Sequence, residues 1–385
     1  MRISELRVTV VSVPFTESET WIWGRRGGIT NALVELVTDE GVTGIGECPG
    51  HPNIGLVCQV LESVRDVVVG EDALRPERLV GLLLARRGLH HFRHAANTAL
   101  GGVEIALWDI VGKVAGKPLS RLLGGPVRDR VSYYRYVPMG PSEWMAEQAA
   151  EAVADGVQTI YLKTGFERRK DVADVAAVRE AVGPAVKLRI DANEAWSPAE
   201  AISIVNELEA FELEFVEQPV SMYDLDGLAR VRRATTTPIA ANQAAWLESN
   251  VLEIVRKRAA DVILTCPHQL HGLVAFKHVA GLCELAGLPI VKHSFGDLGV
   301  TTYAAAHVLG TVPNATLASQ THYNLLDDDV IVGGPPPFVA GSLTLPDAPG
   351  IGVELDRDRV ATYAELYERD GEFSVYGPLA ERPVS

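Results

Sequence analysis

The sequence has few cysteines, no long apolar run and a deficit of positive charge. Its four cysteines form no C-x-x-C pair and show no zinc-type spacing near histidine, which argues against a disulfide framework and a structural zinc site. Apolar runs such as "GLLLA" are far shorter than the roughly 20 residues of a membrane span, and "MRISELRV" lacks the apolar core of a secretory signal. The 35 Lys and Arg against 50 Asp and Glu give a formal charge of -15, which disfavours nucleic acid and anionic membranes. We therefore expect a cytoplasmic protein with neither partner.

The chain does contain a regular repeat within its 385 residues. From about residue 131, eight short runs rich in β-branched residues alternate with amphipathic helical stretches, and successive runs end 24 to 28 residues apart. This period is typical of a (β/α)8 barrel, which we expect over residues 126–325. A doubly wound sheet is the rival fold, but no G-x-G-x-x-G turn follows the first run. The runs end at Val137, Lys163, Asp191, Glu217, Asn242, Cys266, His293 and Ser319.

The two ends of the chain follow other patterns. Residues 1–125 begin with strand-like runs joined by a "TDEG" turn and continue into a helical region, which predicts an α+β capping domain. Residues 326–385 are rich in Gly and Pro and contain strand pieces without a core of their own. We expect this C-terminal segment to pack back on the capping domain.

Active sites of such barrels lie at the carboxyl ends of the strands, so the residues that end the runs are site candidates. Asp191 and Glu217 end neighbouring strands, and two carboxylates at one mouth repel each other unless one is protonated or a cation bridges them. Magnesium prefers oxygen ligands and keeps open positions for substrate, and the amide oxygen of Asn242 on the next strand is a legitimate third ligand. We therefore predict a Mg²⁺ site at Asp191, Glu217 and Asn242.

Lys163 and His293 lie on either side of this predicted metal site. A nearby cation favours the neutral amine of a lysine, which is the form that a general base requires. With the substrate carboxylate on the metal, Lys163 would remove the proton on the adjacent carbon, and the metal would stabilise the resulting enediolate.

These residues resemble the enolase superfamily, in its mandelate racemase and muconate-lactonizing branch. The resemblance spans nearly the whole chain through "GVTGIGE", "IALWDIVGKVAGKPLSRLLGG", "YLKTG", "RIDAN", "VEQP", "PIAANQ" and "PDAPGIGVELD". It implies the same metal ligands, Lys163 as one acid/base, His293 as the opposite one, a small carboxylate substrate and a homo-oligomer.

The sequence departs from the family pattern at several strand ends. Tyr161 replaces the first lysine of a K-x-K motif, Cys266 stands where an acid usually supports the histidine, and Ser319 replaces an acid that often contacts substrate. Without a carboxylate behind it, His293 is less firmly oriented and is a weaker base, although it can still donate a proton. This asymmetry favours an elimination over a racemisation, which requires two matched bases.

The resemblance also points to covering segments in the first domain. The stretch "WIWGRRGG" stands where this family places a mobile loop, in which Arg25 or Arg26 would pair with a distal anionic group and Trp21 or Trp23 would exclude water. His51 lies in the second covering loop of the family. We select Trp23 and Arg25, together with Tyr161 and Ser319, as substrate-binding residues.

The leading hypothesis is a magnesium-dependent dehydratase of a hydroxylated carboxylic acid. A racemase, epimerase or cycloisomerase of a carboxylate is the alternative within the family. Because Asn242 replaces a metal-binding acid, a barrel that binds a carboxylate without turning it over also remains open.

Overall fold

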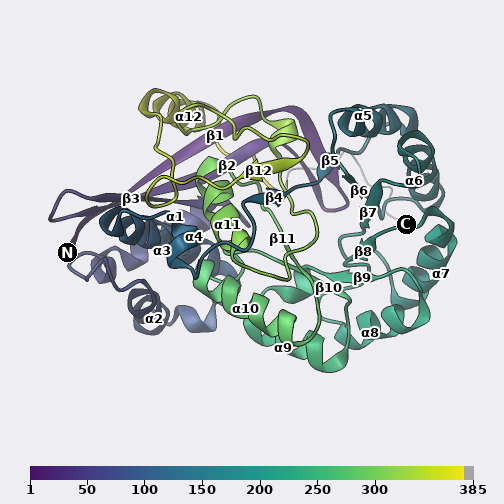
Figure 1. Ribbon diagram of the computed structural model, residues 1–385, viewed down its shortest axis with the longest axis horizontal. Coiled ribbons are helices and arrows are strands. Elements are labelled where there is room, and N and C mark those ends of the chain that lie inside the picture. The colour runs from purple at the N-terminus through teal and green to yellow at the C-terminus, as the bar shows by residue number, and fades with distance from the viewer. Residues whose placement is uncertain (377–385) are drawn as a thin grey trace.

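The structure is a computed structural model that describes residues 1–376 (Figure 1). The chain opens with three antiparallel strands in the order β1-β2-β3, which are β1 (Ile3–Trp21), β2 (Gly24–Thr38) and β3 (Thr43–Pro49). The β2–β3 turn falls on the expected "TDEG" stretch, where the backbone N–H of Val42 donates to Thr38 Oγ1 at 3.0 Å and Gly41 has a positive φ of 83°. The residues that follow are mostly helical, in α1 (Ile54–Val68), α2 (Pro76–Arg86), η1 (Leu89–His91), α3 (Arg93–Ala115) and α4 (Leu119–Leu122).

Helix α3 packs directly on β3, and glycines make this close approach possible. A Cβ placed on Gly46 would lie 1.9 Å from the carbonyl oxygen of Gly102, which is closer than any side chain tolerates. Gly44 and Gly46 of β3 and Gly102 of α3 are therefore explained by packing between these two elements.

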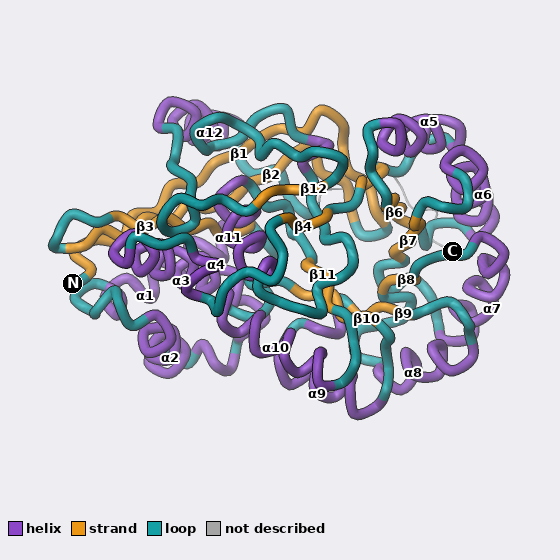
Figure 2. Tube along the Cα trace, viewed as in Figure 1, coloured by secondary structure: helices purple, strands orange, loops and turns teal. Residues whose placement is uncertain are grey.

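Seven parallel strands form the second sheet, in the order β11-β10-β9-β8-β7-β6-β5. Helices surround this curled sheet, as Figure 2 shows, so the expected barrel-type α/β fold is confirmed. The strands are β5 (Arg135–Val137), β6 (Thr159–Lys163), β7 (Lys187–Asp191), β8 (Phe215–Glu217), β9 (Ile239–Ala241), β10 (Val262–Thr265) and β11 (Ile290–Lys292). The helices are α5 (Ser142–Ala154), α6 (Arg168–Val182), α7 (Pro198–Leu208), α8 (Leu225–Ala234), α9 (Glu248–Lys257), α10 (Leu273–Leu285) and α11 (Gly299–Gly310), with short turns η2 (Glu209–Phe211), η3 (Gln243–Ala245) and η4 (Tyr323–Leu325).

The sheet differs from the expected eight strands at its closure. The run that ends at Ser319 does not form a strand. It closes the barrel through two backbone hydrogen bonds of Ser319: the N–H of Ser319 donates to Ser132 O at 2.7 Å, and the carbonyl of Ser319 accepts from Tyr134 N at 3.0 Å. The first expected run is split, because β4 (Arg130–Ser132) pairs antiparallel with β12 (Ser342–Thr344) outside the barrel. The first part of this run thus pairs with β12 and the second part, β5, pairs with β6, so only β5 belongs to the barrel sheet.

One buried glutamate joins β3 to helix α11 of the barrel. Glu47, on β3, accepts hydrogen bonds from the backbone N–H groups of Leu298 at 2.7 Å and Thr301 at 2.8 Å, at the start of α11. These hydrogen bonds satisfy N–H groups at the start of α11 that have no partner within the helix, and they tie α11 to β3.

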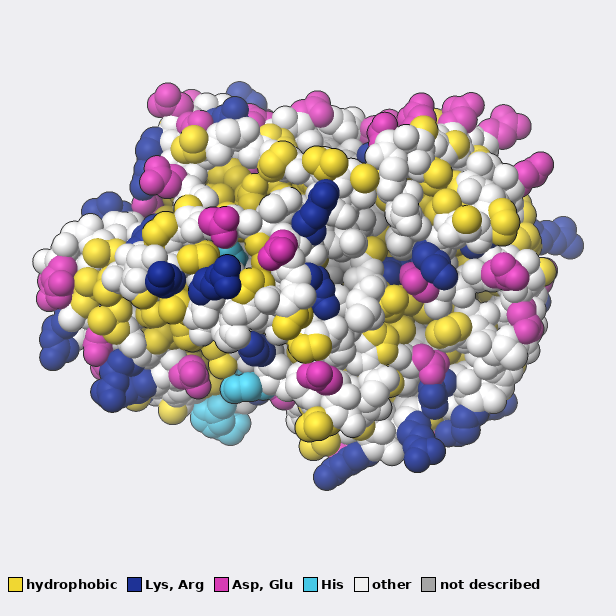
Figure 3. All heavy atoms as spheres, viewed as in Figure 1, with side chains coloured by type: hydrophobic (Ala, Val, Ile, Leu, Met, Phe, Trp, Pro, Cys, Tyr) yellow, Lys and Arg dark blue, Asp and Glu magenta, His cyan; other side chains and the backbone are white. Residues whose placement is uncertain are grey.

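The last helix, α12 (Arg357–Asp370), packs against β1, and Arg357 pairs with Glu35 of β2. Helix α12 therefore lies on the first sheet (Figure 1), whereas Ile331 and Leu345 of the same C-terminal segment lie against the two ends of barrel helix α11, at Gly299 and Gly310. Positive and negative side chains are interspersed over the face in Figure 3, and no helix within residues 1–376 is long and apolar enough to cross a membrane.

Candidate active site

Parallel pairing places the predicted strand-end residues side by side. Lys163 of β6 is the register partner of Asp191 of β7, and Asp191 is the partner of Glu217 of β8. Lys163 Nζ donates to Asp191 Oδ2 at 2.7 Å, and all three side chains are buried. The hydroxyl of Tyr161 donates to the same oxygen at 2.6 Å and accepts from Lys163 Nζ at 3.1 Å. Tyr161 therefore lies beneath the lysine and orients both members of the ion pair.

Glu217 has an unusual environment for a carboxylate. It is completely buried, and neither of its oxygens has a hydrogen-bond partner among the described residues. Burial, and next the neighbouring Asp191, hold the pKa of Glu217 well above its usual value. Two unpartnered carboxylate oxygens beside a second carboxylate are a fitting donor set for a divalent cation.

Asn242 follows the next strand, β9, and lines a cavity at the mouth of the barrel together with Lys163 and His293. Its amide nitrogen is directed at the carbonyl of Leu264, at 3.4 Å, which leaves Oδ1 as the atom available to a cation. Within residues 1–376 no three His, Cys, Asp or Glu side chains are grouped to hold a metal ion. The amide oxygen of Asn242 is the candidate third ligand beside Asp191 and Glu217.

Gln218 is a supporting residue that the sequence reasoning missed. It has a positive φ of 36°, and its Oε1 accepts from the backbone N–H groups of Asn242 at 3.0 Å and Ala244 at 3.1 Å. Strained backbone of this kind persists only where surrounding contacts enforce it. The glutamine of "VEQP" thus holds the turn that presents Asn242.

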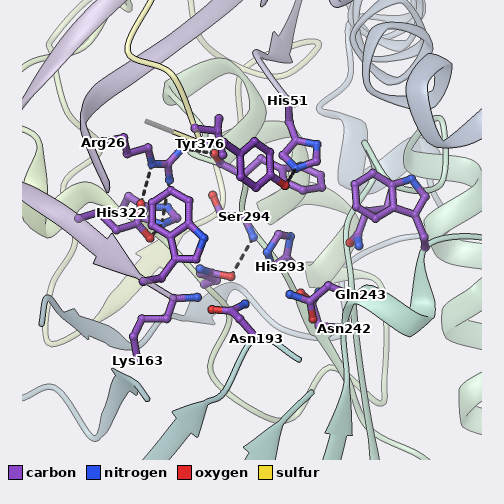
Figure 4. Close-up of a pocket in the computed structure, with 17 residues that line it drawn as sticks. Arg26, His51, Lys163, Asn193, Asn242, Gln243, His293, Ser294, His322 and Tyr376 are labelled. Carbon is purple, nitrogen blue, oxygen red and sulfur yellow. Dashed lines mark hydrogen bonds and ion pairs between the residues drawn. The ribbon is translucent and has the colours of Figure 1, made fainter. Parts of the chain in front are cut away.

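His293 follows β11 and lines the cavity across from Lys163 (Figure 4). Its ring packs edge-on against Phe295, and its Nδ1 is buried with no partner in the described part of the chain. Burial, followed by the charges of Lys163 and Lys292, lowers the pKa of His293 well below the ordinary value. Cys266, the residue after β10, is buried, and burial raises the pKa of its thiol to about 12, so this neutral thiol cannot replace the missing acid.

The four predicted substrate-binding residues have different places. Trp23 is the second residue of the β1–β2 turn, half-exposed, and its Nε1 donates to Asn193 O at 2.8 Å at the cavity edge. Tyr161 lies beneath Lys163, and Ser319 is buried, with Oγ accepting from Lys292 N at 3.3 Å. Arg25 is exposed and points to Ser18, outside the cavity.

The expected loop "WIWGRRGG" is instead a hairpin, and this explains which arginine faces the cavity. Thr20 pairs with Arg25 and Glu19 pairs with Arg26, and side chains alternate along a strand. The buried Arg26 therefore lines the cavity in place of Arg25. If the sequence is assumed to form a hairpin here, the alternation of side chains along a strand predicts that Arg25 and Arg26 lie on opposite faces.

Comparison with known proteins assigns both the first domain and the barrel to one family. Residues 8–124 match the model of the mandelate racemase / muconate lactonizing enzyme N-terminal domain, and residues 144–359 match the enolase C-terminal domain-like model. A D-galactarolactone cycloisomerase of Agrobacterium fabrum is 30% identical, over 94% of this chain and 99% of that protein. A probable glucarate dehydratase of Streptomyces coelicolor is 31% identical, over 86% and 83%.

A solved relative agrees in overall structure. An enolase from Thermobispora bispora, complexed with magnesium and formate, is 31% identical and superposes with a TM-score of 0.89 over 97% of this chain and 95% of that one. The chain therefore belongs to the enolase superfamily and is an enzyme of its mandelate racemase and muconate-lactonizing branch.

Proposed function

We propose that this enzyme dehydrates a hydroxylated carboxylic acid with the help of Mg²⁺. The observation that carries the proposal is the asymmetry of the two flanking bases. Lys163 is held by Asp191 and Tyr161, whereas Nδ1 of His293 has no supporting group within the described residues. Racemisation requires two comparable bases, while an elimination requires one base and one proton donor.

Asp191, Glu217 and Asn242 Oδ1 would hold the magnesium ion. When bound, the ion would offset the negative charge that develops on the substrate carboxylate as the adjacent proton leaves. Lys163 Nζ is held 2.7 Å from Asp191 Oδ2 and lines the cavity, and as a general base it must present a neutral amine. This is the form that accepts a proton.

The residues divide the elimination between the two sides of the cavity. Lys163 takes the proton from the carbon next to the carboxylate, and the electron pair left behind forms a double bond to the neighbouring carbon. The bond from that carbon to its hydroxyl oxygen breaks, and the oxygen leaves as water with a proton from His293. Burial contributes most to the lowered pKa of His293 and the charge of Lys163 contributes next, so a neutral Lys163 removes the second of these contributions.

The cavity itself suits a hydroxylated acid. Five side-chain amides line it, and the oxygens of Asn193 and Gln243 are buried without a hydrogen-bond partner among residues 1–376. Unpaired acceptors of this kind are satisfied by hydroxyl donors of a ligand. The five amides belong to Asn193, Asn242, Gln243, Gln269 and Gln320.

The test is a panel of hydroxylated acids, incubated with the enzyme and Mg²⁺ in heavy water. We expect one or more acids to exchange the proton next to the carboxylate and to lose water, giving a 2-keto-3-deoxy acid that semicarbazide detects. A product of unchanged composition and inverted configuration would identify a racemase or epimerase. Calorimetric binding without exchange would identify a binding protein and overturn the proposal.

Replacing Asn242 by aspartate is expected to tighten Mg²⁺ binding at least about tenfold, because the charge of the ligand set controls affinity at such sites. Titration calorimetry at constant pH measures the effect. The matched control is Gln243→Glu, which adds the same charge at the neighbouring residue of the same cavity. Equal tightening in both variants, or none in Asn242→Asp, would exclude Asn242 as a ligand.

A further inference from the structure

The end of the cavity opposite the predicted metal site contains an arginine that is already neutralised. Arg26 Nε donates to Glu19 Oε2 at 2.6 Å, and both side chains are buried. Its NH1 donates to the carbonyl of Phe295 at 2.6 Å, and its NH2 lies 3.4 Å from His322 Nε2. All three guanidinium nitrogens are engaged, so a second substrate carboxylate would have to compete with Glu19 for this cation.

Next to this ion pair lie two uncharged groups from distant parts of the sequence. The hydroxyl of Tyr376 lies 3.0 Å from His51 Nε2, and the His51 ring stacks on Phe295. Burial, assisted by the charge of Arg26, lowers the pKa of His51 to about 3, so the imidazole is neutral at physiological pH. His51 Nδ1 is buried without a partner in the described part of the chain, and both residues line the cavity. In Figure 4 they lie on the side opposite Lys163.

Tyr376 is brought to the cavity by a C-terminal stretch that is bonded along the first domain. Ser12 Oγ donates to Gly371 O at 3.1 Å, and Phe373 N donates to Thr30 Oγ1 at 2.9 Å. The backbone N–H of Ile54 donates to Glu372 Oε2 at 2.9 Å. The stretch then passes the β1–β2 turn, where a Cβ on Gly24 would lie 3.0 Å from Val375 O. These contacts place Tyr376 opposite His51.

We infer that His51 and Tyr376 form a neutral subsite for a substrate hydroxyl, and that the Glu19–Arg26 pair makes this end of the cavity selective for acids with one carboxylate over acids with two. The inference rests on the proposed function for the placement of the first carboxylate at the metal. A hydroxyl both donates and accepts, which matches an imidazole and a phenol, each able to do either. An additional carboxylate would lose its hydration there and would meet no free cation among the cavity-lining residues of the described chain.

The experiment compares six-carbon aldonic acids with the aldaric acids of the same configuration, which differ only in a second carboxylate at C6. Binding is measured by calorimetry with Mg²⁺ and does not depend on turnover. We expect the wild type to bind the preferred monoacid at least about tenfold more tightly than its diacid. Glu19→Gln, which frees Arg26, is expected to shift that ratio toward the diacid by about tenfold or more, and thermal unfolding checks that this variant folds.

Tyr376→Phe provides a second test on a half-exposed side chain. It is expected to weaken monoacid binding about tenfold, the effect of about one good hydrogen bond, with Mg²⁺ affinity unchanged. The control is Tyr363→Phe, whose hydroxyl contacts Asp328 outside the cavity. Diacids that bind as tightly as monoacids, or a Tyr376→Phe variant equal to the control, would overturn the inference. The predicted binding preference without proton exchange would support the inference and contradict the proposed function.

Discussion

Replacing Lys163 by methionine is expected to lower the rate of dehydration at least about 1,000-fold and to abolish exchange of the substrate α-proton. Methionine preserves most of the length of the side chain but cannot accept a proton. The variant also loses the 2.7 Å contact to Asp191, so two buried carboxylates are left without the ammonium beside them. Without Mg²⁺ its midpoint of thermal unfolding should fall, and adding Mg²⁺ should restore part of that loss.

The matched control is Lys187→Met. Lys187 is the first residue of β7, exposed at the opposite end of the strand that delivers Asp191. The same substitution there should leave exchange and dehydration within about twofold of the wild type, since the N-terminal ends of barrel strands serve stability. Proton exchange that continues at the wild-type rate in Lys163→Met would exclude Lys163 as the base.

The arrangement of Lys163, Asp191 and Glu217 was predictable because parallel pairing carries regular spacing into space. One residue ends each strand, adjacent strands are in register, and the ends therefore meet. The same regularity failed at Ser319, where closure depends on backbone groups of residues 132–134 that also serve an outer strand. A periodic pattern cannot show this sharing.

The far side of the cavity was less predictable because it is built by segments without a periodic signal. Arg26 faces inward only because the first two strands extend to a two-residue turn, and the sequence suggested a loop there. Tyr376 is more than 300 residues from His51, its partner, and reaches it through isolated hydrogen bonds of the C-terminal stretch. Such contacts between distant segments depend on tertiary structure rather than on local composition.

Replacing His293 by glutamine is expected to separate the two halves of the reaction. Glutamine keeps a hydrogen-bond donor near the leaving hydroxyl but cannot transfer a proton, so dehydration should slow about 100-fold to 1,000-fold. Exchange at the α-carbon depends on Lys163 and should remain within about tenfold of the wild type. Both rates come from one experiment in heavy water, in which proton NMR follows exchange and semicarbazide follows the keto product.

The pH dependence of these rates tests the same assignment. Because the pKa of His293 lies well below its ordinary value, its charged form is scarce at neutral pH and becomes more populated as pH falls. The ratio of dehydration to exchange should therefore rise toward lower pH in the wild type and become flat in His293→Gln. Loss of exchange together with dehydration in His293→Gln would instead make the histidine a second base, and the enzyme would then be better described as a racemase or epimerase. The unsupported Nδ1 of His293 and the firmly held amine of Lys163 favour the first outcome.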